Sequence, residues 1–268
     1  MNRIRGYMQE DVVNAICENV KKFNIPGVRF VRWGEPTLHP DYVNIMRKVK
    51  NSGAMIHINT NGSLITEEQI HDLIDMGLDS IKFSFQGADE GTYNEMRQGG
   101  EYKTLLKTIT KFYRLRGDSE NPFIQVSTTL TSESDDQVAN FKHDVENICD
   151  YFNIGYTKLN HLSVGEMNIP QEMKDKVRSL QEKEKSKHKR LLVCPEAFDK
   201  LSVNWNGDVT LCCQDYDNFL VIGNILDMDL KQLFLSKAAE QYRKIIAAGE
   251  YDKIRCCRYC YELVPLNK

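Results

Sequence analysis

The sequence contains no apolar run of about 18 or more residues, the length that a membrane-spanning helix needs. Residues 1–6 also lack the apolar core of a secretory signal peptide. Basic residues are not in excess, since the net charge is −3 and the pI is about 6.1, and nucleic-acid binding through a general positive field is therefore disfavoured. We expect a cytoplasmic protein that binds neither membranes nor nucleic acid.

What the chain does have is enough apolar material for a substantial core. Its 268 residues are 41% hydrophobic and 27% charged, which allows one large domain or a large and a small one. No internal repeat or low-complexity tract is evident.

The cysteines are unevenly distributed, because six of the eight fall between positions 194 and 260. Cys194 precedes a predicted hairpin whose turn is residues 205–208, and the second strand of this hairpin runs into Cys212 and Cys213. Residues 256–260 add a Cys-x-x-Cys knuckle, a spacing that lets two thiolates on one turn hold one metal centre. Hairpin and knuckle together predict a closed four-sulfur site.

Within this site we prefer one cysteine from each adjacent pair. The predicted ligands are Cys194, Cys212, Cys257 and Cys260, and the predicted non-ligands are Cys213 and Cys256. A disulfide framework is disfavoured in a large chain without a signal peptide. Four thiolates suit zinc and an iron–sulfur cluster equally well, so the spacing leaves both open. Cys17 and Cys149 are interpreted as small buried hydrophobic residues on amphipathic helices.

Helix and strand patterns alternate through the first 160 residues. The expected helices cover 10–23, 42–51, 66–77, 102–114 and 137–151, and the expected strands cover 28–31, 55–58, 80–85, 123–130 and 155–159. Thr66 and Gln69 are typical of a helix N-terminus, and Gly77 is typical of a C-cap. Short strands separated by single helices predict a parallel sheet with right-handed crossovers.

Polar side chains mark the carboxyl ends of these strands, the edge at which α/β sheets bind ligands. The residues concerned are Glu35, Asn59, Asn61, Ser84, Gln86 and Ser127. One acidic group among amides and hydroxyls suits a polar zwitterionic small molecule. The alternative is that these residues merely cap strands, because turns favour Asn, Ser and Gly.

Two further segments have simpler interpretations. The charge-dense stretch between Gln171 and Arg190 predicts a solvated helical connector. Asp208, Asp215 and Asp217 lie near the cysteines and could contact a substrate, but acidic residues beside turns are more often solvated.

Several of these motifs resemble those of radical S-adenosylmethionine (SAM) enzymes. Residues 32–40 read Arg-Trp-Gly-Glu-Pro-Thr-Leu-His-Pro and look like the Gly-Glu-Pro motif of that family, and Thr-Asn-Gly at 60–62 matches the tip of the next strand. Residues 83–87 look like the following strand end. The C-terminal pattern, a cysteine, then Gly-x-x-x-x-Cys at 207–212, then a cysteine knuckle, resembles the SPASM/Twitch extension.

The resemblance implies a partial (β/α)6 radical SAM barrel, with the first strand missing, followed by a small cysteine-rich SPASM/Twitch-like domain. The implied domains are residues 1–165, a connector at 166–192, and residues 193–268. It further implies that Gly34, Glu35 and Pro36 bind the amino group of SAM, and that the other strand-end residues, Asn59, Asn61, Ser84, Gln86 and Ser127, line the cofactor site. The four thiolates would hold one auxiliary [4Fe–4S] cluster, which could accept an electron from a substrate radical.

The sequence departs from the family in one respect: it contains no Cys-x-x-x-Cys-x-x-Cys motif for the cluster that cleaves SAM. A second, SAM-binding [4Fe–4S] cluster is expected only if further N-terminal residues supply it. We therefore expect an N-terminally incomplete version of an enzyme that modifies or oxidises a peptide or small polar substrate by radical chemistry, with flavodoxin or ferredoxin as electron donor. The alternatives are a degenerate homologue and a non-catalytic protein that binds zinc or an iron–sulfur cluster.

Overall fold

The computed structural model describes residues 4–31, 33–97, 99–131, 133–157, 159, 162, 164–185, 193–258 and 260. The chain divides into two compact units, one comprising residues 13–157 and the other comprising residues 1–12 and 158–268. Among the helices of the described ranges, none combines the length and apolarity of a bilayer span.

The unit of residues 13–157 is a five-stranded parallel α/β sheet in the order β1-β2-β3-β4-β5. Its strands are β1 (Gly27–Phe30), β2 (Met55–Thr60), β3 (Ser80–Ser84), β4 (Phe123–Leu130) and β5 (Tyr151–Tyr156). The helices are α1 (Glu10–Phe23), which begins in the other unit, η1 (Pro36–Leu38), α2 (Tyr42–Asn51), α3 (Glu67–Asp75), α4 (Glu90–Met96), α5 (Tyr102–Arg116) and α6 (Asp135–Val145). This architecture confirms the predicted parallel α/β fold.

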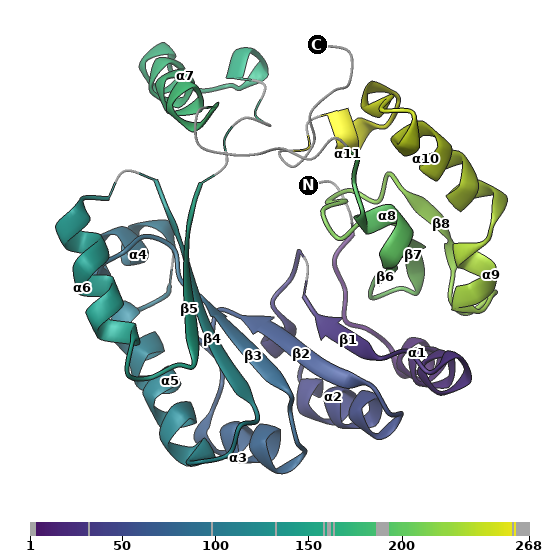
Figure 1. The fold of residues 1–268 in the computed structure, drawn as a ribbon, viewed down its shortest axis with the longest axis horizontal. Helices are drawn as coiled ribbons and strands as arrows, with labels where there is room; N and C mark the ends of the chain where they lie inside the picture. The colour runs from purple at the N-terminus through teal and green to yellow at the C-terminus, as the bar shows by residue number, and fades with distance from the viewer. Residues whose placement is uncertain are drawn as a thin grey trace. The chain divides into compact units, whose positions relative to one another are not determined.

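Helices α2, α3, α5 and α6 lie along one face of the curved sheet (Figure 1). On that face Ile58, Ile81 and Val126 are fully buried, and they join Phe112 of α5 and Phe141 of α6 in a single core. The alternate residues of the same strands are only partly buried or exposed, because successive side chains of a strand point to opposite faces. The sheet therefore has an apolar face beneath the helices and a polar face opposite.

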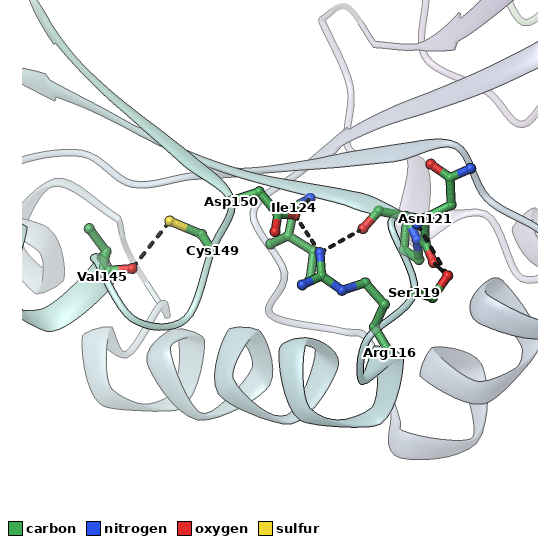
Figure 2. Close-up of polar contacts among 8 residues, drawn as sticks. Arg116, Ser119, Asn121, Ile124, Val145, Cys149 and Asp150 are labelled. Carbon is green, nitrogen blue, oxygen red and sulfur yellow. Dashed lines mark hydrogen bonds and ion pairs between the residues drawn. The ribbon is translucent and has the colours of Figure 1, made fainter.

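In two places of this unit, an aspartate directly before a strand links one helix and two strands. Figure 2 shows Arg116 at the end of α5 directed towards Asp150, which precedes β5. Asp150 Oδ2 also accepts a hydrogen bond of 2.6 Å from the backbone N–H of Ile124 in β4. Asp79 repeats the arrangement before β3, with Lys50 Nζ at 2.6 Å and the N–H of Ile56 at 2.7 Å. Both clamps lie at the amino ends of the strands.

The C-terminal unit contains the cysteine-rich segment. Its helices are η2 (Val164–Glu166), α7 (Gln171–Lys185), α8 (Glu196–Asp199), α9 (Leu230–Phe234), α10 (Lys237–Ala247), η3 (Tyr251–Lys253) and α11 (Arg255–Arg258), and its strands are β6 (Ser202–Val203), β7 (Asp208–Thr210) and β8 (Val221–Asn224). The three strands form an antiparallel sheet in sequence order. The predicted hairpin turn is confirmed, with Gly207 at a φ of +86° and its N–H bonded to Asn204 O at 3.0 Å.

Most predicted elements of the first 160 residues agree with the structure to within two residues, but two do not. Helix α6 ends at Val145, and β5 begins at Tyr151 rather than residue 155. The reason is that the N–H of Asp150 already bonds Ile124 O at 2.9 Å, so this residue belongs to the start of the strand. Helix α4 and strand β8 were not predicted. Residues 186–190 of the predicted connector helix lie outside the described residues.

Candidate functional site

The carboxylate of Glu35, which follows β1, accepts four hydrogen bonds. Its Oε1 receives the N–H of Thr37 at 3.2 Å, the hydroxyl of Thr37 at 2.8 Å and the hydroxyl of Thr60 at 2.7 Å. Its Oε2 receives the N–H of Asn61 at 2.8 Å. Glu35 is thus both the N-cap of η1 and a link from this loop to the tip of β2.

The Gly-Glu-Pro loop is therefore fixed by its acidic side chain and presents its backbone. Gly34 is exposed, and a Cβ added there would meet no atom within 4 Å, so there is space beside the loop for a bound group. Pro36 lacks an N–H and begins the 3₁₀ turn. Carbonyl oxygens of such a loop can accept hydrogen bonds from an ammonium group.

The other predicted strand-end residues lie on the polar face of the sheet. Ser84 and Ser127 are direct partners in the β3–β4 register, and the strand pairing continues beyond them through the hydrogen bond from Phe85 N to Ser127 O at 2.7 Å. Gln86 follows at the next alternate position and is half-buried. Asn61 Oδ1 caps the following turn by accepting from the N–H and hydroxyl of Ser63 at 2.9 and 2.7 Å.

Three basic residues on the same face were not predicted: Arg29 of β1, His57 of β2 and Lys82 of β3. Burial lowers the pKa of His57 despite its hydrogen bond to Asn59, and burial together with Arg29 lowers the pKa of Lys82. Both occupy the positions that alternate with the buried residues of their strands. That alternation is visible in the sequence, but only the strand ends were considered there.

Backbone amides act on two of the predicted cluster ligands. The N–H of Gln214 donates to Cys212 Sγ at 3.3 Å, and the backbone amides of Glu196 and Ala197 at the start of α8 act to lower the pKa of Cys194. Burial raises the pKa of both thiols, and the amide bonds act in the opposite direction. A positive metal centre can replace the proton in such a buried, amide-lined position.

The adjacent pairs of cysteines are not equivalent. Cys213 Sγ donates to Glu196 Oε2 at 3.5 Å, so its hydrogen bond is directed to a carboxylate. Cys256 and Cys257 lie with their sulfurs 4.0 Å apart, and this contact lowers the pKa of Cys257 and raises that of Cys256. The contacts of the first pair favour Cys212 as its thiolate, whereas either sulfur can be the donor in the contact between Cys256 and Cys257, so the choice of Cys257 stays a prediction.

The knuckle itself is a closed turn, since the N–H of Cys260 bonds Cys257 O at 3.1 Å. A charge on Cys257 raises the pKa of Cys194, and charges on Cys194 and Cys257 raise that of Cys212, which places these sulfurs within electrostatic reach of one another. In the part of the chain that is described, no three His, Cys, Asp or Glu side chains are positioned around a single metal ion.

Asp215 corrects one expectation. It is fully buried rather than solvated, and its two carboxylate oxygens accept from the N–H groups of Phe219 and Leu220 at 2.9 and 2.8 Å. Its role in the described structure is to shape the loop that follows Cys212 and Cys213. Such local capping is a common use of Asp, and the sequence offered no sign of the burial.

The comparisons with known proteins cover both units. Residues 1–145 match the family model described as the Radical SAM superfamily, and residues 194–261 match the one described as an iron–sulfur cluster-binding domain, SPASM.

Among characterised relatives, the chain is 29% identical over 134 residues to a tungsten-containing aldehyde ferredoxin oxidoreductase cofactor-modifying protein of Pyrococcus furiosus, covering 48% of this chain and 37% of that protein. It is 36% identical over 58 residues to a PqqA peptide cyclase of Bradyrhizobium diazoefficiens, covering 22% and 15%. The aligned parts thus span less than half the length of these curated relatives.

Solved structures share the fold over almost the whole chain. The crystal structure of Streptococcus suis SuiB aligns with a TM-score of 0.67 at 15% identity, covering 98% of this chain and 68% of that one. Native anSMEcpe with bound AdoMet aligns with a TM-score of 0.66 at 16% identity, covering 97% and 81%.

Proposed function

Because the chain belongs to the radical SAM superfamily and carries an iron–sulfur cluster-binding SPASM domain, we propose that it binds SAM at the carboxyl edge of the β1–β5 sheet and serves radical modification or oxidation of a peptide or small polar substrate. The cofactors of this family are SAM and [4Fe–4S] clusters. A flavodoxin or ferredoxin is the proposed electron donor.

The observation that carries the proposal is the fixed Gly-Glu-Pro loop. Since the Glu35 carboxylate is committed to Thr37, Thr60 and Asn61, its role is to hold the backbone of residues 34–36 at the tip of β2. The carbonyls of that backbone would accept from the α-amino group of SAM in the open space beside Gly34. Ser84, Ser127 and Gln86 would contact its other polar groups from the neighbouring strands.

Cys194, Cys212, Cys257 and Cys260 would hold the auxiliary cluster. A bound [4Fe–4S] cluster supplies one-electron transfer. The protein's part is to keep the four thiols at least partly buried and to place the amides of Gln214, Glu196 and Ala197 near two of the sulfurs, because hydrogen bonds to cluster sulfurs tune the potential of the cluster. The sequence contains no Cys-x-x-x-Cys-x-x-Cys motif, so no residue is assigned to a SAM-cleaving cluster.

The names of similar proteins support a peptide or small-molecule substrate. They include a PqqA peptide cyclase, SuiB bound to the precursor peptide SuiA, and a GTP 3′,8-cyclase. BtrN was crystallised with AdoMet and 2-DOIA, a further small molecule, and its fold matches with a TM-score of 0.56.

SAM binding by the anaerobically reconstituted chain tests the proposal. We expect titration calorimetry to detect SAM binding and the Glu35→Gln variant to weaken it about tenfold, because an amide removes at least one charge-assisted hydrogen bond from the loop. Glu67→Gln is the matched control, since Glu67 is an exposed partner of Lys111, and it should bind SAM like the parent. If the parent does not bind SAM, or if Glu35→Gln binds it equally well, the proposed SAM site is wrong.

A further inference from the structure

The polar face of the β1–β5 sheet carries positive charge without acidic residues. The strands β1 to β5 contain no Asp or Glu at all. They contain three basic residues, Arg29, His57 and Lys82. His57 and Lys82 occupy positions that alternate with the buried residues of their strands, and Arg29 is the register partner of His57. The charge therefore lies on the face opposite the helices.

The three basic residues are close to one another. Arg29 is the direct partner of His57 in the β1–β2 register, and Lys82 is the partner of Asn59 on one side and Gln125 on the other. Arg29 acts on the pKa of His57 and of Lys82, and in each case lowers it, with no carboxylate acting in the opposite direction. Two cations thus share one part of the face without a counter-ion among the described residues.

His57 is held neutral and in one orientation. Its Nδ1 lies 2.7 Å from the hydroxyl of Ser80 and its Nε2 lies 2.6 Å from Asn59 Oδ1. Because Asn59 Oδ1 can only accept, Nε2 carries the proton and Nδ1 accepts from Ser80. This arrangement leaves the amino group of Asn59 as a donor, in the strand position opposite Lys82.

We propose that Arg29 and Lys82, with the amide groups of Asn59 and Gln125, form a binding site for an anionic group of the substrate, a carboxylate or a phosphate. Among the described residues, the side chains of Arg29, Lys82 and Gln125 have no hydrogen-bond or ion-pair partner, and the amino group of Asn59 is a further donor. The four positions run across β1 to β4. A single anion bound there would supply the counter-charge that the sheet lacks.

The site uses Asn59, which the family resemblance placed at the cofactor site, but Lys82 and Gln125 are separate from the proposed SAM contacts. Lys82 and Gln125 precede Ser84 and Ser127 by two residues in their strands, a rise of about 7 Å. An anionic group held at Lys82 would therefore lie below the SAM-binding edge and anchor a substrate whose reacting part points towards that edge. The inference rests on the proposed radical SAM function, because it names the chemistry of that enzyme's substrate.

A binding titration tests the site without turnover. The full chain is prepared with ¹³C-labelled histidine, the ring signal of His57 is assigned with His57→Gln, and inorganic phosphate or acetate is added at constant ionic strength and a pH of about 7.5. We expect a saturable shift of the His57 signal, and Lys82→Gln and Arg29→Gln should each weaken the binding about tenfold or more. The comparison of phosphate with acetate identifies the preferred anion.

Two control variants keep the result interpretable. Lys82→Arg preserves the charge and should bind the anion within about threefold of the parent, while Lys107→Gln, on the exposed side of α5, should change nothing. A response that never saturates, or one that is the same in all variants, overturns the anion site. If SAM produces the same shift and phosphate competes with it, the site holds the carboxylate of SAM and the substrate assignment is overturned. If Glu35→Gln instead binds SAM as well as the parent does, that result counts against the proposed function and not against the anion site.

Discussion

At the scale of single residues, neighbours of the same type have different contacts in this chain. Cys212 accepts a backbone hydrogen bond from Gln214, whereas Cys213 donates to a carboxylate oxygen of Glu196. An amide donor stabilises a thiolate, and a carboxylate acceptor stabilises a protonated thiol. The contacts therefore distinguish a ligand from a non-ligand where cysteine spacing alone does not.

We expect Cys212→Ala to remove most of the visible charge-transfer absorbance of the reconstituted cluster, because one of four thiolates is lost. Cys213→Ala should keep this absorbance, since Cys213 bonds Glu196 instead. Absorbance and iron content of the two variants, reconstituted in parallel, provide the comparison. Retention in Cys212→Ala together with loss in Cys213→Ala would show that the ligand assignment is wrong by one position.

The sequence predicted only those residues of the candidate site that lie at the ends of strands. Glu35 and Asn61 were both predicted from their positions after strands, and the structure joins them by a hydrogen bond. His57 and Lys82 were missed because they lie within strands, where basic residues were not considered. The burial of Asp215 depends on a loop conformation that no local pattern specifies.

At the scale of secondary structure elements, the two aspartate clamps fix the start of each strand they join. Asp150 connects α5, β4 and β5, and the side chain of its partner Arg116 is only 6% exposed. Asp79 connects α2, β2 and β3 through Lys50. Each clamp satisfies a backbone N–H at the beginning of a strand, where the ladder leaves it without a partner.

Replacement of Asp150 by Ala should lower the free energy of unfolding by about 3 kcal/mol, because it leaves a nearly buried arginine without its carboxylate partner and a backbone N–H unpaired. Glu90→Ala is the control, since Glu90 and Lys103 form an exposed pair, and its effect should stay below about 1 kcal/mol. Urea unfolding of both variants measures the difference. Equal effects would mean that the clamp contributes no more than a surface ion pair.

The order of elements was well predicted because alternation and capping residues are local signals. Thr66 and Gln69 form the expected capping box of α3, and Gly77 has the expected positive φ of +74°. The boundary between α6 and β5 was predicted wrongly because Tyr151 suits a helix or a strand, and its pairing with Gln125 in β4 decides the matter. The two paired residues are far apart in the sequence, so no local pattern could predict their contact.

At the scale of the whole molecule, the two proposed cofactor sites belong to different compact units. The unit of residues 13–157 carries the Gly-Glu-Pro loop and the anion site, and the other unit carries the cysteines. The predicted boundaries at 165 and 192 remain predictions. Closing a four-thiolate site joins Cys194 to a knuckle more than 60 positions later in the sequence, so the cluster should also stabilise the segment between them.

Iron and labile-sulfide analysis of the anaerobically reconstituted chain, together with Mössbauer spectroscopy, determines whether the C-terminal cysteines hold an iron–sulfur cluster. We expect about four iron and four sulfide per chain, with the spectrum of a [4Fe–4S] cluster, and their loss in Cys257→Ala. One tightly bound zinc per chain without labile sulfide would contradict this expectation and would favour a non-catalytic metal-binding protein.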